Sequence, residues 1–370
     1  MNFYNQFNQQ NWDQTLADIY SKTSADVERA LGKQQNRSLD DFQALISPAA
    51  YPFLEEMAGL SRELTQKRFG KTVQMYVPLY LSNKCSNGCK YCGFNSGNDF
   101  ERVTLTIDQI LEEVKVIKKM GYDHVLLVSG ESKSTGIDYL KTVMEAVKPH
   151  FSNFSMEVPP LEQHEYEELI QRGLYAVLVY QETYGPKYPF YHPKGRKKDF
   201  NYRLLTPHRL GAAGIYKIGL GTLIGLDDWR TDAYFTATHL AYLEKVYWKT
   251  KYSISFPRIR PASGSLSPAV EMSDGELLQL ISAYRILNEN VELSISTRET
   301  ETFRDHIIGL GITSVSAGSK TNPGGYSMPD DSMDQFQVED QRSPAEIANI
   351  IQQNGFEPVW KDWFGEDLSM

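Results

Sequence analysis

The feature that most constrains the fold is an alternation of short runs rich in β-branched residues with longer amphipathic segments, repeated eight times after about residue 74. The short runs predict strands at residues 74–81, 124–129, 154–158, 176–180, 217–221, 252–256, 291–296 and 312–317. Helices between consecutive strands force parallel pairing, and eight such units favour a closed barrel over an open sheet. We therefore predict an α/β fold, a (β/α)8 TIM-type barrel. An open doubly wound sheet is the alternative.

The segments between the strands predict helices, which include residues 106–120, 137–148, 161–172, 231–248 and 273–288. Two of these helices begin with capping-box spacing, Thr106 with Gln109 and Ser273 with Glu276. Further helical patterns at 12–31, 38–46 and 49–69 predict an N-terminal helical extension over residues 1–70, outside a barrel over residues 71–320. A C-terminal extension over residues 321–370 carries a tail helix at 344–354. Residues 184–203 are predicted to form an aromatic and basic loop.

All three cysteines of the chain lie within residues 85–92. A secreted disulfide framework would have an even and denser set, so this trio indicates metal ligands in a reducing compartment. The trio follows the first predicted strand, at the end of a barrel where enzymes of this fold place their chemistry. The thiolates of Cys85, Cys89 and Cys92 can hold a [4Fe–4S] cluster and leave one iron open. A zinc site, which would need a fourth ligand, and a chance group of structural cysteines are the alternatives.

The spacing Cys-x3-Cys-x2-Cys, with the aromatic Tyr91 directly before the last cysteine, resembles the signature of the radical S-adenosylmethionine (SAM) superfamily. The resemblance implies that the open iron binds the amino and carboxylate groups of SAM. It also implies that an electron from the reduced cluster cleaves SAM into methionine and a 5′-deoxyadenosyl radical, which removes hydrogen from a substrate. A non-catalytic cluster carrier or redox-sensing scaffold is the alternative from another class of protein.

Three later strand ends resemble the elements with which this superfamily contacts SAM. The sequence Ser129-Gly130-Glu131 is similar to the Gly-Gly-Glu element that holds the SAM amino group, although Ser129 replaces the first glycine. Glu182 stands where relatives bind the ribose or the carboxylate. Gly221 belongs to a glycine-rich strand end similar to the adenine-contacting element, and glycine permits close backbone approach. The resemblance thus implies cofactor contacts at Tyr91, Gly130, Glu131, Glu182 and Gly221. A plain turn and a solvated carboxylate are the alternatives.

Arginines follow the sixth and seventh predicted strands, at Arg258 and Arg298, and the eighth strand contains Ser316. The planar fork of arginine suits a carboxylate of a substrate or cofactor. We choose Arg298 with Ser316 as the first candidate for a carboxylate clamp and Arg258 as the second. The alternative is that Arg298 pairs with Glu299 or Glu301 and only closes the top of the barrel.

Residues 180–184, 256–261, 296–299 and 316–320 extend the resemblance over nearly the whole chain, towards the aromatic amino-acid lyase branch of the superfamily. Within that branch the chain resembles the tyrosine lyases of thiamine thiazole biosynthesis. This implies cleavage of the Cα–Cβ bond of L-tyrosine into 2-iminoacetate (dehydroglycine) and p-cresol. Tryptophan lyases are the alternative. The related tyrosine lyase of hydrogenase maturation adds a cysteine-bearing C-terminal domain, whereas this chain has no cysteine after Cys92.

The composition indicates where such an enzyme would work. A net charge of −9 argues against a nucleic-acid partner, and the basic stretch at residues 194–198 is interpreted as a solvated loop. No apolar run is long enough to cross a membrane, and the N-terminus lacks a signal peptide, so we expect a cytoplasmic protein. The resemblance implies two protein partners: thiazole synthase, which would receive the labile imine, and a flavodoxin- or ferredoxin-type electron donor.

Overall fold

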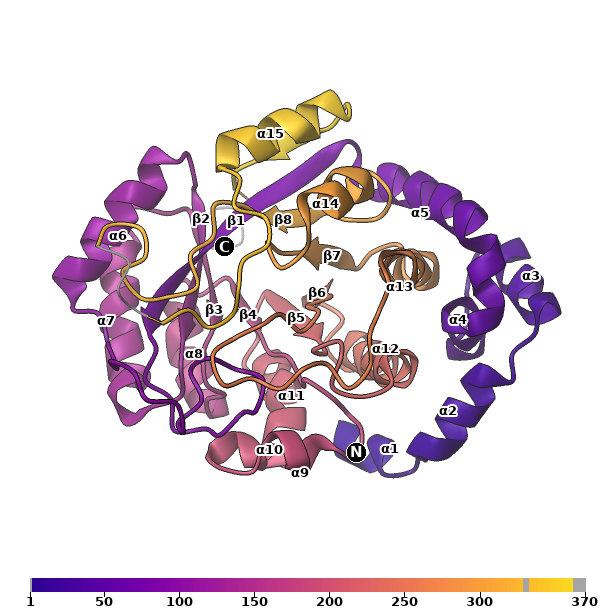
Figure 1. The fold of residues 1–370 in the computed structure, drawn as a ribbon, viewed down its shortest axis with the longest axis horizontal. Helices are drawn as coiled ribbons and strands as arrows, with labels where there is room; N and C mark the ends of the chain where they lie inside the picture. The colour runs from indigo at the N-terminus through magenta and orange to yellow at the C-terminus, as the bar shows by residue number, and fades with distance from the viewer. Residues whose placement is uncertain (1, 329–332, 362–370) are drawn as a thin grey trace.

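A computed structural model describes residues 2–328 and 333–361 and shows a closed parallel barrel surrounded by helices (Figure 1). Its eight strands are β1 (Thr72–Ser82), β2 (His124–Ser129), β3 (Asn153–Glu157), β4 (Ala176–Leu178), β5 (Lys217–Gly221), β6 (Lys251–Ser255), β7 (Glu292–Ile295) and β8 (Ser314–Ser316). Each strand pairs with the next one in the chain, and β1 pairs with both β2 and β8. The predicted (β/α)8 barrel is confirmed, and the open sheet is excluded.

A ninth strand, β9 (Glu357–Val359), lies outside the barrel proper and was not predicted from the sequence. It pairs in parallel with Thr72–Gln74, the first residues of β1. The three-residue length and the central Pro358 explain the omission, because proline lacks a backbone N–H and is confined to the margins of sheets. The strand β1 therefore has three partners along its 11 residues.

The side chains of β1 alternate between the two sides of the barrel wall, as the period of a strand requires. Val73, Val77 and Leu81 are fully buried in the main core beneath the surrounding helices. Tyr76 and Tyr80 point to the other side and line the inside of the barrel. The strand thus supplies both the packing surface for the helices and part of a polar interior.

A ring of helices covers the strands (Figure 1). It comprises α6 (Ile107–Lys119), α7 (Ile137–Val147), α8 (Gln163–Gln171), α11 (Thr206–Ala212), α12 (Trp229–Val246), α13 (Asp274–Leu287) and α14 (Glu301–Ile307). The predicted capping boxes at Thr106 and Ser273 are both formed, with side-chain and backbone hydrogen bonds in each direction. Among the described residues, none of the helices is both long and apolar enough to span a lipid bilayer.

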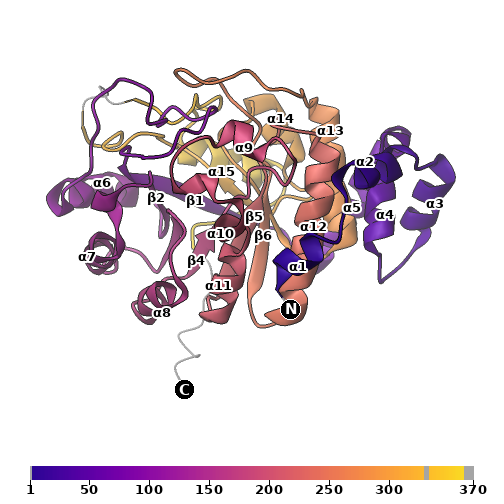
Figure 2. The same cartoon turned by 90° about the horizontal axis from the view of Figure 1, so that it is seen from below.

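The N-terminal helices lie on the outside of the ring, where α2, α4 and α5 contact α12 or α13 (Figures 1 and 2). They are α1 (Phe3–Phe7), α2 (Trp12–Tyr20), α3 (Ser24–Gly32), α4 (Leu39–Ile46) and α5 (Leu54–Phe69). The predicted continuous helix over residues 12–31 is wrong, because Thr23 caps a new helix through a capping box with Asp26. The helix predicted from residue 49 begins instead as the 3-10 turn η1 (Pro48–Phe53). The division of the chain at residues 70 and 320 stays a prediction.

Residues 184–203 are not the irregular loop that the sequence predicted. They form α9 (Tyr188–Tyr191), the 3-10 turn η3 (Arg196–Lys198) and the start of α10 (Phe200–Leu204). These elements have three to five residues each, too few to show a hydrophobic period. The backbone N–H of Gly88 donates to the carbonyl of Lys194 over 3.0 Å, so this segment packs directly on the cysteine loop.

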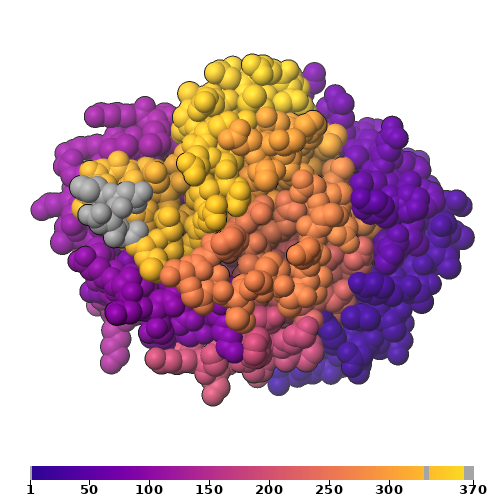
Figure 3. Space-filling view, in the orientation of Figure 1, coloured from indigo at the N-terminus to yellow at the C-terminus, as the bar shows by residue number. Residues whose placement is uncertain are grey.

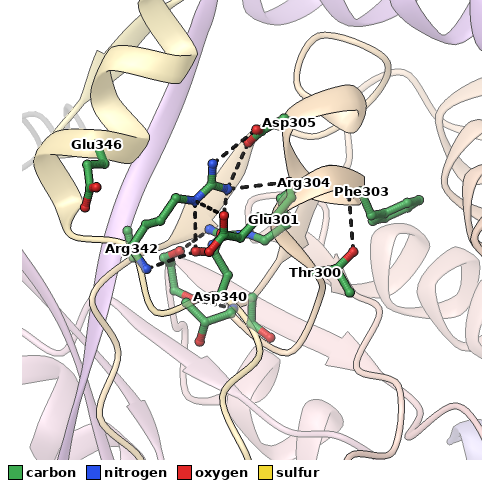
Figure 4. Close-up of polar contacts among 12 residues, drawn as sticks. Thr300, Glu301, Phe303, Arg304, Asp305, Asp340, Arg342 and Glu346 are labelled. Carbon is green, nitrogen blue, oxygen red and sulfur yellow. Dashed lines mark hydrogen bonds and ion pairs between the residues drawn. The ribbon is translucent and has the colours of Figure 1, made fainter.

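The last described part of the chain crosses the mouth of the barrel. We call residues 333–342 the strap; they lead into α15 (Pro344–Gln353), the tail helix predicted from the sequence. Figure 4 shows how Asp340 and Arg342 of the strap join Arg304 and Asp305 of α14 in one network of ion pairs. Figure 3 shows the same face of the molecule, where orange and yellow segments surround a central hollow.

Candidate active site

The hollow is a cavity at the carboxyl ends of the strands, the position of active sites in this fold. Its wall includes the three cysteines and most of the other residues singled out in the sequence. These are Tyr91, Gly130, Glu131, Glu182, Arg298 and Ser316. The structure therefore brings residues from positions 85 to 316 into a single cavity. Arg258 and Gly221 are not among the described residues that line it.

Arg102 holds the cysteine loop in shape. Its guanidinium donates to the carbonyls of Asn83 and Phe94 over 3.0 and 2.8 Å, and to those of Asn95 and Asn98 over 2.6 and 3.0 Å. One partly buried side chain thus provides hydrogen bonds to four loop carbonyls. The chain itself therefore supplies hydrogen bonds that hold the loop in this conformation.

Two of the three thiols, Cys89 and Cys92, lie in an environment that opposes their ionisation. Burial raises the pKa of Cys89, and burial together with the charges of Cys89 and Cys85 raises the pKa of Cys92 to about 12. A cationic metal centre reverses this balance, because a coordinating thiol is deprotonated. Among the described residues, no three His, Cys, Asp or Glu side chains are grouped to hold a single metal ion. The thiolates of the three cysteines are the ligand type that an iron–sulfur cluster takes, so these residues could hold one.

Gly130 and Glu131 connect the end of β2 to the cysteine loop. A Cβ atom at Gly130 would lie 2.4 Å from the carbonyl oxygen of Lys84, so only glycine fits this close approach. The backbone N–H of Ser86 donates to the carbonyl of Glu131 over 2.7 Å, and the amide of Asn87 donates to its carboxylate over 2.7 Å. One carboxylate is therefore fixed beside the thiols, at the edge of the cavity.

Glu182 has an unusual backbone conformation, with φ at +73°, which a residue other than glycine rarely adopts. Its buried carboxylate accepts a hydrogen bond from Lys197, and Arg203 lies 3.6 Å away. Burial alone would raise the pKa of Glu182, but these two cations lower it. Neither Lys197 nor Arg203 was singled out in the sequence, since both come from the segment interpreted as a loop. That interpretation of the basic stretch is wrong for Lys197, whose side chain is largely buried.

Tyr91 is held by a buried histidine. The Nδ1 atom of His192 lies 2.8 Å from the carbonyl of Tyr188, so Nδ1 carries the proton and Nε2 accepts the hydroxyl hydrogen of Tyr91 over 2.8 Å. Burial lowers the pKa of His192 to about 3, which keeps the ring neutral.

Gly221 was predicted to permit close approach of the backbone to the cofactor. In the structure its close neighbour is the adjacent strand, since a Cβ atom at Gly221 would lie 2.7 Å from the carbonyl oxygen of Ser255.

Arg298 lines the cavity, is partly buried, and forms no ion pair with Glu299 or Glu301, so the pairing proposed as an alternative is wrong. Glu299 instead accepts hydrogen bonds from Arg258 and Arg260. The guanidinium of Arg298 lies over the ring of Phe336 in the strap, 3.3 Å from its centroid. Within the described residues its guanidinium forms one hydrogen bond, a long contact of 3.5 Å to the backbone carbonyl of Arg258. Most of its donors thus remain available to a ligand.

The other two candidate clamp residues differ in their availability. Ser316, on the strand adjacent to the end of β7, lines the cavity, and its hydroxyl accepts the backbone N–H of Thr297 over 3.2 Å. The same hydroxyl also interacts with Tyr76, and because it rotates freely its hydrogen can turn to a ligand instead. Arg258 is occupied: besides Glu299, it donates to the carbonyl of Met272 over 3.0 Å and to Asp274 over 2.8 Å. The structure thus places Arg298 and Ser316 together and leaves Arg258 in a structural network.

Several cavity residues were not singled out in the sequence. Glu157 ends β3, and the rule that active-site residues follow barrel strands would have selected it. Tyr180 and Tyr76 line the interior and bond to Ser255 and Ser294 over 3.1 and 3.3 Å. Gln335 of the strap accepts the hydroxyl hydrogen of Tyr80 over 2.6 Å. No local pattern marks Gln335, because its place over the barrel depends on the whole fold.

Comparison with known proteins agrees with this site. The model of the radical SAM superfamily matches residues 79–235, and that of the biotin and thiamin synthesis associated domain matches residues 255–357. The chain is 49% identical over 364 residues to the 2-iminoacetate synthases of Escherichia coli and Salmonella typhimurium, covering 98% of this chain and 96% of each relative. The structure of the hydrogenase maturase HydG from Carboxydothermus hydrogenoformans superposes with a TM-score of 0.86 at 29% identity, covering 97% of this chain and 83% of that one.

The chain belongs to the radical SAM superfamily, whose members use an iron–sulfur cluster and SAM. Within the superfamily it belongs to the 2-iminoacetate synthase family, which consists of lyases.

Proposed function

We propose that this enzyme cleaves the Cα–Cβ bond of L-tyrosine and releases 2-iminoacetate and p-cresol, with methionine and 5′-deoxyadenosine formed from SAM. The observation that carries the proposal is the arrangement of Arg298 and Ser316, a largely unpaired guanidinium and a hydroxyl group in a cavity that also contains the three cysteines. Such a pair suits the carboxylate of a free amino acid. The family relationship supplies the reaction class.

In this proposal Cys85, Cys89 and Cys92 hold a [4Fe–4S] cluster, and SAM occupies the adjacent part of the cavity. When bound, the reduced cluster supplies the electron that cleaves SAM and so initiates hydrogen removal from the substrate amino group. Glu131 is fixed to accept from the ammonium group of SAM. Glu182 stays ionised between Lys197 and Arg203, which suits a ribose hydroxyl and the nearby SAM carboxylate.

The remaining part of the cavity matches an aromatic amino acid. Leu126, Val128 and Leu178 provide apolar wall, and Arg298 would bind the carboxylate at one end. The hydroxyl groups of Tyr76 and Ser294 lie deeper in the barrel, where a phenol could form hydrogen bonds. An indole has no group equivalent to the phenolic oxygen, and we therefore favour tyrosine over tryptophan.

Two protein partners and a cellular location complete the proposal. The imine product hydrolyses in water, so direct transfer to thiazole synthase would protect it. The cluster needs an external one-electron donor of the flavodoxin or ferredoxin type. Thiolates and an open iron require a reducing compartment, which favours the cytoplasm.

The test is an anaerobic assay of reconstituted, reduced enzyme with SAM and either tyrosine or tryptophan, with the products separated by chromatography. We expect 5′-deoxyadenosine and p-cresol from tyrosine alone. Formation of 5′-deoxyadenosine without p-cresol would retain the superfamily and reject tyrosine as the substrate. A fully loaded cluster that never cleaves SAM would instead favour the non-catalytic carrier.

A further inference from the structure

We propose that Glu157 binds the amino group of the amino-acid substrate and accepts its proton before the hydrogen atom is removed. This inference rests on the proposed function, because it assigns a role within the same cavity. Glu157 is the last residue of β3, and it lines the cavity together with Arg298. It would complete the recognition of an α-amino acid, whose carboxylate Arg298 is expected to bind.

The first argument is that the Glu157 carboxylate has no partner in the chain. Within residues 2–328 and 333–361, no hydrogen bond or ion pair reaches it, and only charges acting at a distance affect it. The other two carboxylates of the cavity are engaged: Glu131 with Asn87, and Glu182 with Lys197. Glu157 is partly buried and faces the cavity, so a ligand that fills the cavity would remove its remaining water. A carboxylate removed from water without a partner is destabilising, so this position suits a ligand that supplies the missing donor.

The second argument is complementarity. Arg298 and Glu157 influence each other electrostatically but do not form an ion pair, which leaves the charge of each available. One free cation and one free anion in the same cavity match the two charges of an amino-acid zwitterion. A substrate that lacked the amino group would leave Glu157 unpaired after binding, and the site would therefore discriminate against it.

The third argument is chemical. At neutral pH the substrate amino group is an ammonium ion, whose nitrogen has no free electron pair. Transfer of one proton to Glu157 breaks an N–H bond, forms an O–H bond and leaves the electron pair on nitrogen. The products of this step are a neutral carboxylic acid and a neutral amine, so charge and atoms balance without a further reactant. The hydrogen atom then leaves from an uncharged amine.

The surroundings of Glu157 suit a proton acceptor that works near neutral pH. Burial, followed by the charge of Glu182, raises the pKa of Glu157 to about 7, whereas the positive charges of Arg298, Lys197 and Arg203 act in the opposite direction. Burial also raises the pKa values of the facing Tyr76, Tyr80 and Tyr180, which keeps their hydroxyl groups neutral. Glu182 stays ionised because its pKa is lowered.

The test compares two ligands and two variants by calorimetry on cluster-loaded, unreduced protein with SAM, where no turnover occurs. The ligands are L-tyrosine and 3-(4-hydroxyphenyl)propanoate, which is tyrosine without its amino group. Glu157→Gln should weaken tyrosine binding about 10- to 100-fold and leave binding of the propanoate unchanged, because only tyrosine has the donor that Glu157 accepts. Glu145→Gln, which removes an exposed carboxylate from α7, should change neither affinity.

A pH series adds a readout that a purely structural role would not affect. Tyrosine affinity of the wild-type protein should rise between about pH 6 and 8 as Glu157 ionises, and that of Glu157→Gln should stay flat. Unchanged tyrosine binding in Glu157→Gln, or an equal loss for both ligands, would overturn the inference while the tyrosine lyase assignment stands. Failure of the wild-type protein to bind tyrosine would overturn both.

Discussion

Two regions at the barrel mouth contain charged side chains removed from the surface, and they differ in whether those charges are paired. In the strap network of Figure 4, Arg304 and Asp340 form a fully buried ion pair, and Arg342 binds the same carboxylate over 2.7 Å. In the cavity, Arg298 and Glu157 are partly buried and lack such partners in the described chain.

The difference separates charges that stabilise the fold, because they are paired, from charges that remain able to bind a ligand. A buried ion pair is costly to break, because removal of one partner leaves the other uncompensated. A charge that the fold itself leaves unpaired weakens the free protein and gains its partner only on binding. Substitutions should therefore reduce stability in the strap network and reduce function in the cavity.

The largest expected effect is at the cysteines. Cys89→Ala should abolish SAM cleavage, because two thiolates cannot hold the cluster in place. Thermal unfolding of the metal-free protein should be nearly unchanged, since Arg102 organises the loop. Iron content, 5′-deoxyadenosine formation and the unfolding temperature would be measured together, and retained SAM cleavage would contradict the cluster assignment.

The next effect is on stability. Asp340→Asn should lower the free energy of unfolding by about 3–5 kcal/mol, because Arg304 would keep a buried, uncompensated charge. Burial would raise the pKa of Asp340, but the hydrogen bond from Arg342 and the charge of Arg304 lower it. The wild-type protein should therefore lose this stability as the pH falls below about 4, and the variant should lack that part of the acid transition. Denaturant titrations at several pH values would measure both effects.

A smaller free-energy change is expected for Arg298→Lys. A point charge cannot reproduce the planar fork, so tyrosine affinity should fall about 10- to 100-fold. The free energy of unfolding should remain nearly constant, in contrast to Asp340→Asn. Calorimetry with tyrosine and a denaturant titration test the two halves of the prediction, and unchanged affinity would place the carboxylate clamp elsewhere.

The smallest effect is expected at the edge of the strap network. Asp305 binds Arg342 over 2.9 Å but is 32% exposed, and water competes for both partners. Asp305→Asn should reduce the free energy of unfolding by less than about 1 kcal/mol. Comparison with Asp340→Asn under identical conditions isolates the effect of burial, and equal losses would show that burial is not the cause.

The residues that could be predicted from the sequence are those governed by local rules. Eight βα units imply a barrel, and a barrel brings its strand ends together, which is why Arg298 was found. Glu131 and Glu182 were found through the resemblance of their strand ends to the SAM-contacting elements of the superfamily. The availability of Arg298 could not be predicted, because it depends on Glu299 binding Arg258 and Arg260 instead. The short helices at residues 188–204 and the contacts of Gln335 and Phe336 were missed for the same reason: they are set by long-range packing.

The pairing of β1 with β8 and β9 has a consequence for how the chain folds. β1 begins at Thr72 but finds these two partners only at residues 314–316 and 357–359, more than 230 residues later. Pairing between residues far apart in the sequence slows folding. We therefore expect β1 to complete its strand pairing later than the other barrel strands. Until β9 docks, the start of β1 presents unpaired backbone groups to any other strand. Truncation before Glu357 should therefore cause aggregation during refolding, even though β9 lies far from the cavity.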